Sequence, residues 1–246
     1  MTTVGTTVGT TGGTPSEIQV RSRLALALDV DDAVEALQLA STLKPWFGVA
    51  KVGLELFAAS GPDVVLRLMD DGFQVFLDLK LHDIPNTVAK AARVAGSLGV
   101  TYLTMHAMGG ADMLRAGVEG LLAGAEAAGL PAPVALGVTI LTSDDSAPRH
   151  ILAKRLMTSM EGGCGGVVCA ASDLQEVGQL APRMVRVVPG IRPESAETHD
   201  QARAATPTAA IAGGADVLVI GRAVTTAPDR EAAAAAITAE IVAALG

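Results

Sequence analysis

Eight short apolar runs, separated by longer stretches with helical periodicity, constrain the fold of this 246-residue chain more than any other feature. The runs are rich in strand-forming residues, and the stretches between them are rich in Ala and Leu. Strands that alternate with helices predict βαβ units and a parallel sheet. The predicted strands are Leu24–Asp29, Val49–Val52, Gln74–Leu79, Tyr102–His106, Val134–Ile140, Gly166–Cys169, Val185–Val188 and Val217–Ile220.

Eight such repeats in about 230 residues predict an α/β fold, a closed (β/α)₈ TIM barrel, formed as a single domain by residues 16–246. The alternative is an open doubly wound sheet, but Asp29-Val-Asp-Asp stands where its glycine-rich turn would follow the first strand. Asp31 or Asp32 is expected to cap the helix predicted over Asp32–Leu43, and Asn86 is expected to cap the helix predicted over Thr87–Leu98. The predicted helices are Asp32–Leu43, Pro62–Asp71, Thr87–Leu98, Ala111–Ala128 and Arg230–Leu245.

Composition excludes several classes of partner. A net charge of −8, four Phe, one Tyr and one Trp disfavour binding to nucleic acid. No apolar run reaches the ~20 residues that span a bilayer, so no membrane association is expected. Cys164 and Cys169 are expected to be reduced core thiols of a cytoplasmic protein. Residues 1–15, rich in Thr and Gly, are expected to form a flexible tail without a secretion signal.

The stretch from Phe76 to Thr87 carries three charges, Asp78, Lys80 and Asp83, at the end of the third predicted strand. Because strand side chains alternate between faces, Asp78 and Lys80 are expected to point the same way. Burying so much charge is unfavourable unless the groups are paired. In a chain with few charged residues, this arrangement predicts an active site.

Polar residues recur at the carboxyl ends of other predicted strands, the edge where barrels of this kind hold their active sites. Any one of them has a structural interpretation, such as a helix cap or an isolated ion pair, but their agreement on one rim favours a site. His82 and His106 are expected to be neutral histidines packed in the barrel mouth. The recurring residues are Asp29, Lys51, Asp78, Lys80, His106, Thr142, Arg192 and Arg222.

The loops after the seventh and eighth strands predict a phosphate site. Pro189-Gly190 with Arg192 follows one strand, and Gly221-Arg222 follows the other. Glycine lets an oxyanion approach the backbone, and arginine grips phosphate with two parallel hydrogen bonds. A phosphorylated small molecule is therefore the expected substrate.

The alternation of sign among Lys51, Asp78, Lys80 and Asp83 indicates the reaction class. Nearby carboxylates keep lysines protonated, which disfavours Schiff-base chemistry, and the interleaved lysines disfavour a Mg²⁺ site. A fixed ammonium stabilises negative charge that develops on a substrate atom and then donates a proton to it.

These motifs closely resemble the bacterial type of the orotidine 5′-phosphate decarboxylase family. The resemblance lies in Ala27-Leu28-Asp29, Lys51-Val52-Gly53, Phe76–Thr87, Leu141-Thr142-Ser143, Pro189–Pro193, Asp200-Gln201 and Val219–Arg222. It implies cofactor-free and metal-free decarboxylation of orotidine 5′-phosphate to UMP and CO₂ in pyrimidine biosynthesis, by a cytoplasmic homodimer. The catalytic residues that it implies are Lys80, as proton donor to C6, with Asp78, Asp83 and Lys51.

The resemblance also implies the residues that bind substrate. Asp29 and Lys51 would hold the ribose, Thr142 would read the ring, and Gln201 would lie between ring and phosphate. Asp83 and Thr87 would reach the site of the partner chain. The substrate-binding residues that it implies are Asp29, Lys51, Asp78, Lys80, Asp83, Ile84, Thr87, Thr142, Pro189, Arg192, Gln201, Gly221 and Arg222.

Two other functions remain open at this point. A Mg²⁺-dependent sugar-phosphate decarboxylase or synthase could use the same Asp-x-Lys-x-x-Asp core. A phosphate-binding barrel without activity could act as a sensor, although a sensor gains nothing from Lys80 between two aspartates.

Overall fold

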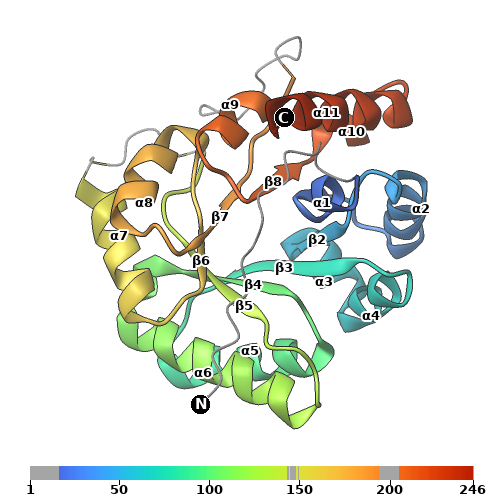
Figure 1. Ribbon diagram of the computed structural model, residues 1–246. Helices are drawn as coiled ribbons and strands as arrows, with labels where there is room; N and C mark the ends of the chain where they lie inside the picture. Colours follow the sequence, from blue (N-terminus) through green and yellow to red (C-terminus); the bar gives the residue numbers. More distant parts are fainter. Residues whose placement is uncertain (1–16, 143, 145–147, 149, 194–204, 246) are drawn as a thin grey trace, which may run out of the picture.

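The computed structural model describes residues 17–142, 144, 148, 150–193 and 205–245. In this part of the chain, eight parallel strands follow one another in sequence order and close into a barrel with helices around it (Figure 1). The closed sheet confirms the (β/α)₈ prediction over the open alternative. The strands are β1 (Leu24–Ala27), β2 (Val49–Gly53), β3 (Gln74–Leu81), β4 (Tyr102–His106), β5 (Val134–Val138), β6 (Gly166–Val168), β7 (Val185–Val188) and β8 (Val217–Ile220).

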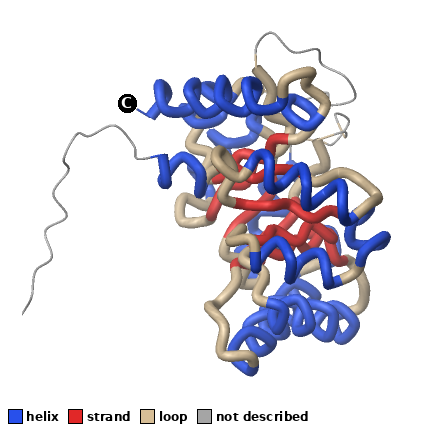
Figure 2. Tube along the Cα trace, turned by 90° about the vertical axis from the view of Figure 1, so that its right-hand side faces the viewer, coloured by secondary structure: helices blue, strands red, loops and turns tan. Residues whose placement is uncertain are grey.

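The helices lie outside the barrel, as the ribbon and the tube views show (Figures 1 and 2). The five predicted helices are all present, with bounds that differ by at most two residues. The helices of the described chain are α1 (Glu17–Ser22), α2 (Ala33–Leu43), α3 (Leu54–Ser60), α4 (Pro62–Asp70), α5 (Pro85–Leu98), α6 (Ala111–Ala127), α7 (His150–Glu161), α8 (Leu174–Leu180), α9 (Pro207–Ala212), α10 (Arg222–Thr225) and α11 (Arg230–Leu245). The two 3₁₀ turns are η1 (Ala107–Gly109) and η2 (Ala171–Asp173).

The two predicted N-caps have different outcomes. Asp32 caps α2, because its Oδ1 accepts a hydrogen bond of 2.8 Å from the Glu35 N–H. The prediction for Asn86 is wrong, since α5 begins at Pro85 and Ile84 is its N-cap residue. Proline suits the first helical position, where its fixed φ is already helical and no N–H is needed. Asn86 therefore lies inside the first turn.

Alternation along the strands produces two apolar layers. Side chains on one face of each strand fill the barrel interior, including Ala25, Val49, Phe76 and Val187. Side chains on the other face, such as Leu26, pack with the helices in a larger cluster. Both layers are buried, which leaves the carboxyl ends of the strands as the place where inward-facing polar residues meet a cavity.

Strand β3 departs from regular geometry close to its carboxyl end. The pairing between β3 and β4 shifts register between Leu77 and Leu81. Lys80 has φ 47°, and it is the one non-glycine residue of the described chain with a positive φ. Irregularities of this kind re-aim side chains and are common beside active sites.

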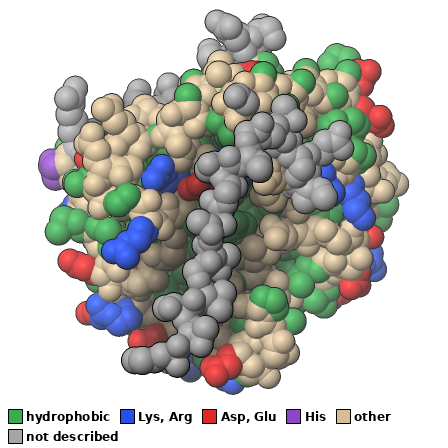
Figure 3. All heavy atoms as spheres, in the orientation of Figure 1, with side chains coloured by type: hydrophobic (Ala, Val, Ile, Leu, Met, Phe, Trp, Pro, Cys, Tyr) green, Lys and Arg blue, Asp and Glu red, His purple; other side chains and the backbone are tan. Residues whose placement is uncertain are grey.

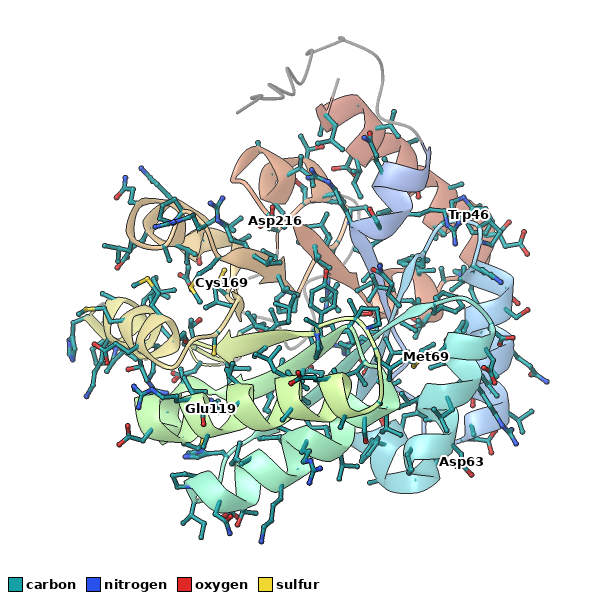
Figure 4. All side chains as sticks on the ribbon, turned by 60° about the horizontal axis from the view of Figure 1, so that its bottom comes forward. Trp46, Asp63, Met69, Glu119, Cys169 and Asp216 are labelled. Carbon is teal, nitrogen blue, oxygen red and sulfur yellow. The ribbon has the colours of Figure 1, made fainter. Side chains whose placement is uncertain are left out.

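Acidic and basic side chains are interspersed on the face drawn in Figure 3. Asp63 on α4 and Glu119 on α6 are exposed on outer helices, whereas Asp216 precedes β8 at the amino end of the barrel (Figure 4). Among the described helices, none has the length and apolar character needed to span a membrane.

Candidate active site

A cavity of about 230 Å³ lies at the carboxyl ends of the strands. Residues from β1, β2, β3, β5, β6 and β8 contribute to it, together with the segments that follow β1, β5, β7 and β8. Most of the rim residues singled out in the sequence are among its walls. The lining residues are Ala27, Asp29, Lys51, Phe76, Asp78, Lys80, Val138, Ile140, Leu141, Thr142, Val168, Pro189, Gly190, Ile191, Arg192, Val219, Gly221, Arg222 and Ala223.

Asp78 and Lys80 form an ion pair in this cavity, as the alternation of β3 predicted. The Nζ of Lys80 donates a hydrogen bond of 2.8 Å to Oδ2 of Asp78. The Asp78 side chain is 14% exposed and the Lys80 side chain 34% exposed. An ammonium group held in this position can stabilise an anion and donate a proton to it.

A second ion pair joins the ends of β1 and β2. The Nζ of Lys51 donates a hydrogen bond of 2.9 Å to Oδ1 of Asp29. Gly53 leaves room beside this pair, because a Cβ at that position would lie 3.2 Å from Lys51 Nζ. Lys51 is buried and Asp29 is largely exposed, so the pair presents polar atoms from the barrel wall to the cavity.

The opposite side of the cavity carries the predicted anion-binding residues. Because β7 is four strands from β3 in an eight-stranded barrel, the loop after β7 lies across from the Asp78–Lys80 pair. That loop contains Gly190, with φ 78°, and Arg192, which is 8% exposed. Gly221 and the exposed Arg222 follow β8. Two guanidinium groups and glycine backbone suit a phosphate group.

An apolar wall lies between the carboxylate-ammonium cluster and the arginines. Val138, Ile140 and Leu141 line it from the end of β5 and the loop beyond, together with half-buried Thr142. Apolar side chains with one hydroxyl suit a flat ring that carries polar edges. The sequence did not identify Val138 and Ile140 as site residues, whereas Leu141 belongs to the Leu141-Thr142-Ser143 motif.

Three of the predicted substrate-binding residues that the structure describes do not line the cavity. Asp83, Ile84 and Thr87 are exposed, and Asp83 Oδ1 accepts a hydrogen bond of 2.6 Å from the Ile84 N–H. The cavity of one chain is therefore formed without them. Gln201 lies outside the described residues, as do Ser143 and the predicted tail.

Two histidines lie beside the cluster. The rings of His82 and His106 are 5.8 Å apart, with His82 exposed and His106 half-buried. Burial lowers the pKa of His106 below its usual value, and the positive charges of Arg155, His82 and Lys80 lower it further. This pKa shift favours the neutral form expected for His106, whereas His82 is not packed in the mouth as predicted.

Potential metal ligands are not clustered. Within the described residues, no three His, Cys, Asp or Glu side chains come together as a metal centre would require. Cys164 and Cys169 are buried and form no disulfide, and burial raises the pKa of the Cys164 thiol to about 12.

Sequence reasoning missed Thr104 on β4. Its hydroxyl donates a hydrogen bond of 2.9 Å to Asp78 Oδ1 and accepts one of 2.9 Å from the Lys80 N–H. The available signal was parity along the strand: Thr104 shares its face with Tyr102, which packs in the barrel interior next to β3. A polar residue on that face needs a partner, and the nearest charges are those of β3.

Comparison with known proteins identifies the family of this chain. The family model described as "Orotidine 5'-phosphate decarboxylase / HUMPS family" matches residues 22–237. The orotidine 5′-phosphate decarboxylase of Halorhodospira halophila is 46% identical over 233 residues, which cover 90% of this chain and 97% of the relative. That of Moorella thermoacetica is 42% identical over 236 residues, covering 91% and 94%.

A solved structure similar to this chain is also an orotidine 5′-phosphate decarboxylase. The orotidine 5′-phosphate decarboxylase of Lactobacillus acidophilus superposes with a TM-score of 0.76 at 34% sequence identity, covering 89% of this chain and 98% of that one. A family match over most of the chain, with relatives of this identity and coverage, establishes membership. The chain belongs to the orotidine 5′-phosphate decarboxylase / HUMPS family of enzymes.

Proposed function

We propose that this protein decarboxylates orotidine 5′-phosphate to UMP and CO₂ in pyrimidine biosynthesis, with Lys80 as the proton donor. The single observation that carries the proposal is the Lys80–Asp78 pair, 2.8 Å apart, in a cavity whose opposite wall holds Arg192 and Arg222. The names of the relatives support the substrate. The positions of the charged side chains in the cavity support protonation of a carbanion by Lys80.

The reaction needs an environment that stabilises a carbanion. The bond between C6 and the carboxylate breaks, its electron pair stays on C6, and CO₂ leaves. A proton from Lys80 Nζ then forms the C6–H bond, and the neutral amine takes up a proton from water. Charge held in place before the reaction is the general source of such stabilisation, and enzymes supply on the order of 8–23 kcal/mol.

The remaining residues bind substrate in this proposal. Asp29 and Lys51 hold ribose hydroxyls through the polar atoms that they present at the rim. Asp78 lies near the substrate carboxylate. The phosphate is bound by Arg192 and Arg222 with the backbone N–H of Gly221, Pro189 lines the cavity beside them, and Thr142 reads the pyrimidine ring. Gln201 is proposed to lie between ring and phosphate.

The complete site requires a second copy of the chain in this proposal. Asp83 and Thr87 are exposed and absent from the cavity of their own chain, which leaves them available to a partner. Ile84, 65% exposed, joins them at the start of α5. We infer a homodimer in which these three residues complete the partner's cavity. Two buried cysteines that form no disulfide support a reducing, cytoplasmic location.

Purified protein mixed with orotidine 5′-phosphate tests the proposal. We expect loss of the orotate absorbance, formation of UMP, and the same rate with or without a metal chelator. A rate that requires added Mg²⁺, or turnover of a sugar phosphate in place of the nucleotide, would favour the Mg²⁺-dependent decarboxylase or synthase. Phosphate binding without turnover of either substrate would favour the sensor.

A further inference from the structure

We propose that Thr104 is a positioning residue that holds both Asp78 and Lys80 in their reactive arrangement. This inference rests on the proposed function. Thr104 is 0% exposed and does not line the cavity, so it acts through its neighbours and not on substrate.

The direction of each hydrogen bond at Thr104 follows from chemistry. A backbone N–H can only donate and an ionised carboxylate can only accept. The hydroxyl oxygen therefore accepts from the Lys80 N–H at 2.9 Å, and the hydroxyl proton goes to Asp78 Oδ1 at 2.9 Å. One side chain thus connects the backbone of the proton donor to the carboxylate that pairs with its ammonium group.

Thr104 also stabilises the irregular end of β3. Lys80 has a left-handed φ of 47°, a conformation that an L-residue keeps only where its surroundings impose it. The register between β3 and β4 shifts at this point, and the Lys80 N–H is bonded to the Thr104 side chain. The hydroxyl therefore takes the place of a regular ladder acceptor where the strand bends.

The same contacts orient the ammonium group. Asp78 uses Oδ1 to accept from Thr104 and Oδ2 to accept from Lys80 Nζ at 2.8 Å. The carboxylate cannot rotate without breaking one of these bonds. With both the backbone and the carboxylate fixed, the Lys80 Nζ is held before substrate arrives, which is the requirement for electrostatic preorganisation.

Thr104→Val tests the role, because valine keeps the shape of threonine and removes the hydroxyl. We expect kcat to fall by about 10- to 100-fold while KM changes by less than about threefold, since the substrate contacts remain. Thr104→Ser restores the hydroxyl and should bring kcat back to within about fivefold of the wild type.

Thr139→Val is the matched control. Thr139 is also a buried threonine of the barrel, and its hydroxyl donates to the Val168 carbonyl at 2.9 Å. Thr104→Val loses two buried hydrogen bonds and Thr139→Val loses one, so a merely structural role predicts a loss of thermal stability in both variants and no loss of kcat that is specific to Thr104→Val. Three results would overturn the proposal. Thr104→Val could keep the wild-type kcat, Thr139→Val could lose as much kcat as Thr104→Val, or Thr104→Ser could fail to bring kcat back.

Crystal structures of the wild type and Thr104→Val separate this inference from the proposed function. If the wild type does not turn over orotidine 5′-phosphate, the proposed function fails, and the position of Lys80 still tests Thr104. We expect the variant to lose the left-handed φ of Lys80 or the 2.8 Å contact with Asp78. Unchanged geometry at both would contradict the positioning role.

Discussion

The Nζ of Lys51 lies 2.9 Å from Oδ1 of Asp29, although the lysine side chain is 11% exposed and the aspartate side chain 60% exposed. A buried cation is thus paired with a carboxylate at the open rim. Pairs with one exposed member add little to stability, because water screens them. The value of this pair is therefore expected to lie in substrate binding.

Asp29→Asn should separate these two effects. We expect kcat/KM to fall by about 10- to 100-fold, as for loss of a charged hydrogen bond, with a stability change below about 1 kcal/mol. Asp32→Ala is the counterpart: it removes the N-cap of α2 and should cost about 0.5–2 kcal/mol while leaving kcat/KM unchanged. Enzyme kinetics and thermal unfolding of both variants test this prediction. A large loss of stability in Asp29→Asn would contradict the assignment of Asp29 to substrate binding.

Arg222→Ala should mainly weaken substrate binding. Loss of a charge-assisted contact to phosphate costs about 1.5–3 kcal/mol, which corresponds to a rise in KM of roughly 10- to 100-fold. Arg183→Ala, an exposed arginine before β7 at the amino end of the barrel, serves as the control and should leave KM unchanged. An effect confined to kcat would contradict binding of the ground-state phosphate by Arg222.

Mixed dimers test whether Asp83 acts across the subunit interface. Lys80→Ala and Asp83→Asn, each expected to be nearly inactive alone, are co-expressed with different tags and purified through both. If Asp83 completes the partner's site, each mixed dimer has one intact site and should recover about half the wild-type kcat. If Asp83 serves its own chain, every site lacks one group and no activity returns.

The pKa of His106 predicts a pH dependence of stability. Burial, followed by the charges of Arg155, His82 and Lys80, lowers this pKa in the folded protein below the usual 6.5. The unfolded chain therefore binds a proton that the folded chain resists, and stability is lost as the pH falls from 6.5 towards the folded pKa.

His106→Asn removes that proton-binding group and keeps an acceptor for the Met108 N–H. We expect Tm to fall less in the variant than in the wild type between about pH 7 and pH 5. An equal fall in Tm between these two pH values in the variant and the wild type would show that His106 does not contribute to the pH dependence of stability.

The sequence predicted the barrel because the signals were local and repeated. The predicted bounds of Tyr102–His106, Val185–Val188 and Val217–Ile220 agree with those of the strands in the structure. The Asp78–Lys80 pair was predicted because side chains two residues apart on a strand point to the same face. Asn86 was misjudged as a cap because the preference of Pro85 for the first helical position prevailed.

What the sequence did not predict depends on contacts between strands. The positive φ of Lys80 and the register shift beside it arise from pairing with β4. Thr104 is an ordinary strand former, and its role is evident only once β3 lies next to it. Asp83 was predicted as a site residue from its place in the charge cluster and Thr87 from resemblance alone, and one chain does not bring either to the cavity.

The rate of decarboxylation by Lys80→Ala at saturating orotidine 5′-phosphate tests the proton-donor role most directly. We expect kcat to fall by about 10³-fold or more, because the variant loses both the stabilising charge and the proton. Lys44→Ala, an exposed lysine after α2 at the amino end of the barrel, should retain the wild-type kcat. A Lys80→Ala kcat within about tenfold of the wild type would contradict the account.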